Sequence, residues 1–268
     1  LTPDDGFPKT KDAATLGDLY VKGRIDQVKH HCDEIADMLA QAGFNCVYAP
    51  VVDLNVNPSC PIIGAMRRSY SDELSVVVGC ASIMIDACER HGIQTVIKHY
   101  PGHGSAVGDT HLGCVDVTDT WHELELAPFH QLANQCGMVM MSHVIARQVD
   151  ELPASLSAAW IERLRTSGFD GVIITDDIQM DGVYTTGKGE GTLAVLADII
   201  LKALCAGNDM VIIGQQQHVL PIAQWPQLLQ ILENAVLSGH WPISSLMASL
   251  ERVSLLRRKL PVAGQVVS

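Results

Sequence analysis

The chain has 268 residues, of which 47% are hydrophobic, with a mean hydropathy of +0.18 and a formal net charge of −12 at pH 7. This length suits one large domain with a sizeable core, and no apolar run approaches the roughly 20 residues of a membrane-spanning helix. The negative charge argues against a nucleic-acid or anionic-membrane partner, because both need clustered Lys and Arg.

The predicted helices and strands alternate along the chain, and the first residues, 1–23, are polar and show no clear periodicity. Ser71, a Thr120–Glu123 capping box and Ser157 are the predicted N-terminal caps of three helices. The predicted elements are a helix at 24–42, a strand at 46–52, a helix at 71–90, a strand at 95–99, a helix at 120–135, a strand at 138–142, a helix at 157–168, a strand at 171–175, a helix at 192–206, a strand at 210–213 and two helices after 226 that are broken near 239–242.

This alternation indicates βαβ units and a parallel sheet. No linker rich in Pro, Gly or Ser divides the chain, so we expect a single domain over residues 1–268. Polar residues gather just after the strands, where the loops of a closed α/β barrel build the active site. A doubly wound open sheet would also place ligands there, but it usually carries a Gly-rich phosphate loop after its first strand, and none is present. The prediction is therefore a TIM-type (β/α)8-like barrel.

Only five strands are recognisable, so three more are needed to complete such a barrel. We expect one of them in the C-terminal region and the others before Leu1, which makes the barrel incomplete at its N-terminus. An incomplete barrel exposes strand edges, and this predicts self-association through the exposed barrel edge.

The eight Cys include no CxxC pair, and several fall on apolar faces of predicted helices or in predicted strands. A buried free thiol behaves as a small hydrophobe, and free thiols favour a reducing compartment. No signal-peptide pattern is visible at the start of the chain. We therefore expect a cytoplasmic protein.

The segment 168–177 carries an apolar strand directly into two adjacent carboxylates, Asp176 and Asp177. Adjacent residues at a strand end point in different directions, so we expect one to face a pocket and the other a flanking loop. A carboxylate in a pocket can act as a nucleophile on the anomeric carbon of a sugar. The alternative is that these side chains only cap the following turn.

The loop from Lys98 to His111 holds one Lys, three His and one Asp. Asp109 lies two residues before His111, and a nearby carboxylate can orient an imidazole and raise its pKa, which suits general acid–base catalysis near neutral pH. The alternative is a hydrogen-bonded loop without chemistry. His99, His103, Asp109 and His111 are also plausible metal ligands, but no HExxH or paired-Cys pattern is present, and Lys98 would repel a cation, so no metal site is expected.

Two further residues complete the set of candidates. Arg68, in the loop 62–71, can bind substrate hydroxyls or a carboxylate through its planar fork, or it can be an ordinary surface arginine. His143 ends the strand predicted at 138–142 and can line a pocket or pack at the barrel rim.

At these residues the chain resembles glycoside hydrolase family 3, and within it the bacterial β-N-acetylglucosaminidase (β-N-acetylhexosaminidase) branch. The resemblance runs from about residue 43 to residue 213. Its anchors are APVVDL at 49–54, IG at 63–64 with RSYS at 68–71, KHYPGHG at 98–104, DTH at 109–111, MSHV at 141–144, PASLS at 153–157, the block 168–180 and AGNDM at 206–210.

The resemblance implies a TIM-type barrel and a retaining mechanism that needs no metal and no other cofactor. Under it, Asp176 is the nucleophile, and His111 is the acid/base with Asp109 as its dyad partner. Lys98, His99 and Arg68 hold a terminal N-acetylglucosamine, with His143 nearby. Two departures stand out: the upstream strand and a DQEGG-like segment are absent before residue 43, and Arg68 follows 63–64 at a slightly longer spacing than is usual in the family.

The leading hypothesis is therefore a retaining, exo-acting β-N-acetylglucosaminidase of cell-wall (peptidoglycan) amino-sugar recycling, whose partner is a substrate with a terminal N-acetylglucosamine. Two alternatives stay open. A β-glucosidase-type member of the family is one, although that branch generally lacks the histidine loop. A non-catalytic sugar-binding remnant is the other, motivated by the missing N-terminal segment.

Overall fold

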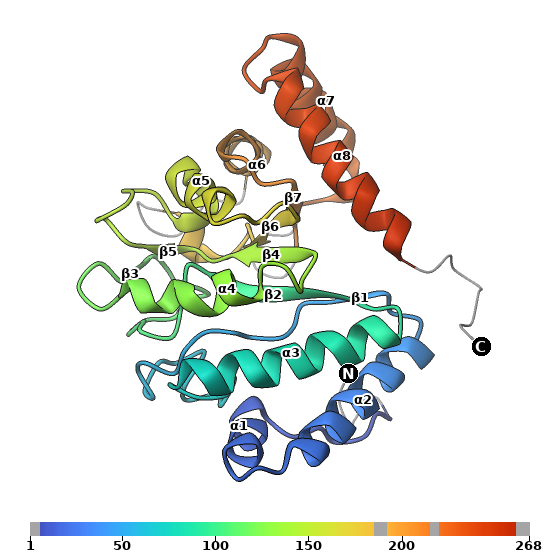
Figure 1. The fold of residues 1–268 in the computed structure, drawn as a ribbon. Helices are drawn as coiled ribbons and strands as arrows, with labels where there is room; N and C mark the ends of the chain where they lie inside the picture. The colour runs from blue at the N-terminus through green and yellow to red at the C-terminus, as the bar shows by residue number, and fades with distance from the viewer. Residues whose placement is uncertain (1–5, 185–191, 215–219, 261–268) are drawn as a thin grey trace.

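A five-stranded parallel sheet forms the centre of the molecule. The computed structural model describes residues 6–184, 192–214 and 220–260 (Figure 1). The strands are β1 (Cys46–Val47), β2 (Gln94–Tyr100), β4 (Met138–Met141), β6 (Val172–Asp177) and β7 (Met210–Ile212), and they lie in the order β1-β2-β4-β6-β7. Each of the five predicted strands contributes to this sheet. The open parallel sheet with helices is the half-barrel expected of an incomplete (β/α) barrel.

Every pairing in the sheet is parallel. Between β4 and β6 the register is regular, with Met138 opposite Val172 and Met141 opposite Thr175. The carboxyl ends of all five strands therefore meet along one edge, which is where the loops can bring side chains from distant parts of the chain together. A second, small sheet pairs β3 (Val115–Asp116) with β5 (Val144–Ile145) beside that edge.

Helices α3, α4 and α5 cover one face of the sheet, because their buried side chains share one cluster with strand residues. Helix α8 packs against the opposite face. The helices are α1 (Ala13–Val21), α2 (Ile25–Gln41), α3 (Leu74–Arg90), α4 (Ala127–Leu132), α5 (Ala158–Thr166), α6 (Leu193–Ala206), α7 (Trp225–Leu237) and α8 (Ile243–Lys259). Within the described ranges, none of them combines the length and the apolar character that crossing a membrane requires.

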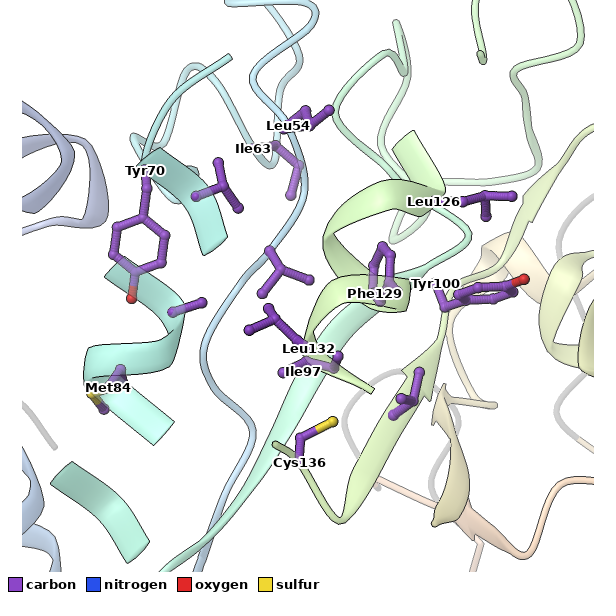
Figure 2. Packing of buried hydrophobic residues seen from close by; sticks show 14 of the residues in the cluster. Leu54, Ile63, Tyr70, Met84, Ile97, Tyr100, Leu126, Phe129, Leu132 and Cys136 are labelled. Atoms are coloured by element: carbon purple, nitrogen blue, oxygen red, sulfur yellow. The ribbon is translucent and has the colours of Figure 1, made fainter. Parts of the chain in front are cut away.

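Alternate side chains of each strand pack into two different clusters. Ile97, Val139 and Ile173 join the large core beneath the helices. Figure 2 shows this core beside β2, where the ring centroids of Tyr100 and Phe129 of α4 lie 5.3 Å apart. The opposite side chains of the strands form a smaller cluster of Val96, Met138, Met140, Val172 and Ile174, against which Val253 and Leu256 of α8 pack. We call the side of the sheet that carries this smaller cluster the inner face.

The predicted cap Ser157 is confirmed by a hydrogen bond, and Thr192, which was predicted only as the start of a helix, is a second cap. The Ser157 hydroxyl accepts from Trp160 N at 3.2 Å and begins α5. Thr192 caps α6 in the same way, accepting from Val195 N. Both residues satisfy a backbone N–H that has no partner inside its own helix, which is why the two helices begin where predicted.

Other local predictions were wrong. The strand predicted at 46–52 contains only β1, because Pro50 has no N–H to donate to a ladder and only an isolated bridge joins Val51 to Lys98. Ser71 does not cap α3, since its hydroxyl accepts from Glu73 N and the helix begins at Leu74.

The predicted helix at 120–135 is a 3-10 turn, η2 (Glu123–Leu126), followed by the short α4. The capping box is formed by His122 and Glu125 instead of Thr120 and Glu123. In addition, α1 lies in the segment where no periodicity was seen, with Asp12 as its cap. The expected C-terminal strand is absent from the described residues 220–260, whose regular structure is helical.

Candidate active site

Lys98 and Asp176 lie on the inner face of the sheet, at the carboxyl ends of β2 and β6. Side chains alternate along a strand, so Asp176 lies on the same side as Ile174, two residues earlier, and Lys98 on the same side as Val96. The two groups interact electrostatically. The pKa of Lys98 is lowered by burial and by the charge of Arg68, while Asp176 acts in the opposite direction. A cation and a carboxylate that influence each other's pKa therefore stand at the end of the apolar inner face.

Asp176 is held in its ionised form by its neighbours. Burial alone would raise its pKa, but interactions with His99 and His143, the Asp177 N–H and Lys98 bring the pKa below the ordinary value of 3.8. The Asp177 N–H donates to Asp176 Oδ1 at 2.8 Å. A buried carboxylate that stays charged is a competent nucleophile.

Asp177 serves a different purpose from its neighbour. Its Oδ1 accepts from Gln179 N at 3.1 Å and from Gly214 N at 2.9 Å. These bonds tie the loop after β6 to the end of β7. The adjacent carboxylates thus divide as the strand geometry predicted, one toward the ionisable groups and one toward the flanking loops.

His143 lies buried after β4 with both ring nitrogens engaged. Nδ1 lies 2.7 Å from Ser155 Oγ and Nε2 lies 2.9 Å from the Asp177 carbonyl oxygen. A carbonyl can only accept, so Nε2 carries the proton and Nδ1 accepts from the serine. Burial lowers the pKa of His143, which favours this neutral form. The imidazole forms a fixed wall beside Asp176.

His99 joins two residues from the loops after β1. Its Nδ1 lies 2.7 Å from Asp53 Oδ2 and its Nε2 lies 3.4 Å from Arg68 Nη2. Arg68 is anchored at its other terminal nitrogen, which donates to the Ile62 carbonyl at 2.9 Å. Asp53 is fully buried and was not among the predicted site residues. Its available signal was its position directly after a predicted strand, which it shares with Asp176.

Asp109 and His111 form a hydrogen-bonded pair in the loop after β2. His111 Nδ1 lies 2.7 Å from Asp109 Oδ1, and the same oxygen accepts from His111 N at 2.8 Å. Burial would raise the pKa of Asp109, but these bonds and the charge of His111 lower it below 3.8. About half of the His111 side chain is exposed, at 48%. An ionised carboxylate can only accept, so His111 Nδ1 carries the proton in this pair.

The loop that carries this pair rests on the loop after β6. Thr110 is buried, its hydroxyl lies 3.3 Å from His103 Nε2, and its carbonyl accepts from Gly182 N at 2.8 Å. The structure therefore brings the pair to the same edge as Asp176. His143 interacts electrostatically with both Asp176 and His111, and its Nε2 donates to the carbonyl of Asp177, next to the nucleophile candidate.

Glu125 is a second buried carboxyl that the sequence analysis did not select. It is 1% exposed, and its Oε2 accepts from Ser105 N at 3.3 Å. Burial raises its pKa from 4.5 to about 7. Glu125 and Asp53 hold the loop 102–105 from two sides, since Asp53 Oδ1 accepts from His103 N at 2.9 Å. No pattern in the sequence links residues this far apart.

Two cavities lie near the first part of the chain. One of about 370 Å³ runs beside β1 and is lined by Val51, Arg68 and Tyr70 among others. Another of about 720 Å³ lies between residues 6–11 and α2 and contains none of the predicted site residues. Over the described part of the chain, no three His, Cys, Asp or Glu side chains gather as a metal ion would need.

Comparisons with known proteins bear on this arrangement. The family model described as "Glycosyl hydrolase family 3 N terminal domain" matches residues 12–256. A "Beta-hexosaminidase" of Neisseria meningitidis serogroup C / serotype 2a is 31% identical over 248 residues, covering 88% of this chain and 65% of that protein. One from Chromobacterium violaceum is 33% identical over 246 residues, covering 85% and 66%. The chain thus spans about 65% of the length of the curated relatives it matches.

Solved structures agree with the family model. A glycoside hydrolase family 3 β-N-acetylglucosaminidase from a Paenibacillus species is 26% identical with a TM-score of 0.77, covering 97% of this chain and 49% of that one. The match to the family model extends over most of the chain, including both strands that carry the candidate residues. This chain therefore belongs to glycosyl hydrolase family 3, and it matches the N-terminal domain of that family.

Proposed function

We propose that this chain is the catalytic barrel of a retaining, exo-acting β-N-acetylglucosaminidase. The observation that carries the proposal is the Gly182 N–H bond to the Thr110 carbonyl, which joins the loop of the Asp109–His111 pair to the loop after the ionised Asp176. The names of the relatives support the substrate class, because those proteins are β-hexosaminidases. Lys98, His99 and Arg68 would hold the terminal N-acetylglucosamine, with His143 as a wall of its site.

In the first half of the reaction, an Asp176 oxygen attacks the anomeric carbon of the sugar. The glycosidic C–O bond breaks, and its electron pair goes to the leaving oxygen, which takes a proton from His111 Nε2. In the second half, water gives its proton to that nitrogen and attacks the anomeric carbon, releasing Asp176. Asp109 keeps the proton on Nδ1, so the exchangeable proton is at Nε2.

Asp176→Ala tests the proposal directly. Hydrolysis of an aryl N-acetyl-β-glucosaminide should fall by about 1,000-fold or more. Asp170→Ala removes an exposed carboxylate before the amino end of β6 and should leave turnover unchanged. A glycosyl fluoride that forms the intermediate faster than it is hydrolysed should add one glycosyl residue to the Asp176 peptide in mass spectrometry. Undiminished turnover by Asp176→Ala would reject the assignment.

The alternatives have separate tests. Aryl glucoside and aryl N-acetylglucosaminide are compared side by side, and faster hydrolysis of the glucoside would favour a β-glucosidase. Binding of N-acetylglucosamine without any covalent intermediate would favour a sugar-binding remnant. Comparing water and phosphate as acceptors, by identifying the sugar product, distinguishes hydrolysis from phosphorolysis.

We also propose a cytoplasmic role in cell-wall amino-sugar recycling. The eight free cysteines support the location, because free thiols favour a reducing compartment. Fractionation of producing cells tests the location, and assay on peptidoglycan fragments tests the substrate.

The single-domain organisation over residues 1–268 stays a prediction. Self-association through the edges at β1 and β7 is also a prediction, and light scattering over a range of concentrations would test it.

A further inference from the structure

Asp53 is a buried carboxylate whose partners all come from one segment of the chain. Its oxygens lie 3.2 Å from His99 N, Oδ2 lies 2.7 Å from His99 Nδ1, and Oδ1 accepts from His103 N at 2.9 Å. The side chain is fully buried. Burial alone would raise its pKa, but His99 and His103 hold the pKa below the ordinary 3.8, so the group is an anion that can only accept.

This anion determines which nitrogen of His99 carries the proton. Because Oδ2 accepts, Nδ1 must donate. Burial lowers the pKa of His99, so the ring is neutral and its Nε2 is a bare acceptor. That acceptor faces Arg68 Nη2, which can only donate, at 3.4 Å. A directed chain of hydrogen bonds therefore runs from Arg68 through His99 to Asp53.

This series of hydrogen bonds connects the negative charge of Asp53 to Arg68, one of two cations at the end of β2; the other is Lys98. Arg68 acts on Lys98 as a like charge, lowering its pKa, while Asp53 acts in the opposite direction. Among the described residues Arg68 makes no ion pair with a carboxylate, and its hydrogen bonds go to the Ile62 carbonyl and to His99. In the described part of the chain, hydrogen bonds connect Asp53 to Arg68 through the imidazole of His99.

We propose that Asp53 is a positioning residue for sugar binding: through the imidazole of His99 it holds the Arg68 guanidinium beside Lys98, at the carboxyl end of β2. This inference rests on the proposed function, since it names Arg68 as a contact of the substrate. It assigns Asp53 no step at the anomeric carbon.

Asp53→Asn makes a sharp test because it reverses one bond and keeps another. The Asn oxygen can still accept from His103 N, which preserves the loop. Its NH2 group would face His99 Nδ1, which must then accept, so the proton moves to Nε2 and points at Arg68. Two donors would face each other, and the guanidinium would leave its position.

We expect Asp53→Asn to raise KM for an aryl N-acetyl-β-glucosaminide by about tenfold or more, with kcat within about threefold of the wild type. The matched control is Asp209→Asn. Asp209 is another fully buried carboxylate; it lies just before the amino end of β7 and forms ion pairs with Arg165 and Arg252. That control should lower Tm and leave KM unchanged. A KM within twofold of the wild type for Asp53→Asn would overturn the proposal.

A second measurement needs no variant and no turnover. Nitrogen-15 NMR of the wild-type imidazoles should show His99 protonated at Nδ1 and bare at Nε2, and the reverse pattern would overturn the proposal even if Asp53→Asn fails to fold. If the wild type hydrolyses no glycoside, the proposed function fails, and the NMR result still decides whether Asp53 orients His99 toward Arg68.

Discussion

The N–H of Gly182, just after β6, donates a 2.8 Å hydrogen bond to the carbonyl of Thr110. Thr110 stands between Asp109 and His111, so this bond links the strand of Asp176 directly to the loop of the acid/base pair. A Cβ at position 182 would lie 2.6 Å from the Thr110 oxygen, closer than side-chain carbons come to a backbone oxygen.

We therefore expect Gly182→Ala to displace the His111 loop and to lower kcat/KM by about 10- to 100-fold. Asp176 itself would stay in place, so labelling of Asp176 by an activated glycosyl fluoride should be retained. Steady-state kinetics and mass spectrometry measure the two effects. A kcat/KM within twofold of the wild type would show that the loop position does not depend on this contact.

Removal of the acid/base pair should depend on the leaving group. Asp109→Ala and His111→Ala should slow an aryl glycoside with a poor leaving group by about 100-fold or more, because its oxygen needs the proton. An aryl glycoside with a low leaving-group pKa should be slowed much less. The measurement is kcat/KM over a series of substituted phenols, and an equal loss across the series would contradict the assignment.

The two adjacent carboxylates of β6 should give opposite phenotypes. Asp177→Ala removes the acceptor for Gln179 N and Gly214 N and should cost about 1.5 to 3 kcal/mol of unfolding free energy. Asp176→Ala removes only the bond from Asp177 N and should cost less stability while abolishing turnover. Urea unfolding at pH 7 with parallel assays compares them. Equal losses of stability would contradict the division of roles.

Glu125 should make stability depend on pH. Its pKa in the folded protein is raised by burial from 4.5 to about 7, so the folded state binds the proton more tightly than the unfolded chain does. The stabilisation from this group is fully present below pH 4.5 and is lost as the pH rises through about 7.

Glu125→Gln keeps a side chain of the same shape and removes the titration. The difference in Tm between variant and wild type should therefore change in favour of the variant as the pH rises from 4.5 to 8. Because the difference is taken at each pH, other titrating groups cancel. A difference that does not change with pH would mean that Glu125 has the same pKa in the folded and the unfolded protein.

Much of the fold was predictable from local patterns. Each strand is an apolar run followed by polar residues, and Ser157 and Thr192 stand where a helix needs a side-chain acceptor. Asp176 and the 98–111 loop were recognisable because ionisable residues are dense there. These signals lie within a few residues of one another, so they can be read without knowing the tertiary structure.

The parts that were missed depend on distant contacts. Asp53 meets His99 across 46 residues, and Glu125 meets Ser105 across 20. Neither residue differs from an ordinary loop or helix-flanking acid when it is read alone. β1 is short because Pro50 has no N–H to donate. The effect of a proline on a strand depends on the neighbouring strand with which it would pair, and the sequence alone does not identify that strand.

The alternation of side chains along β6 has a consequence for how this region can change over time. An insertion or deletion of one residue inside the strand would exchange the directions of Asp176 and Asp177, sending the wrong carboxylate toward His143. Such length changes are therefore excluded between residues 172 and 177 in any active descendant. The exposed loops on the far side of the molecule are free of this constraint and can vary in length.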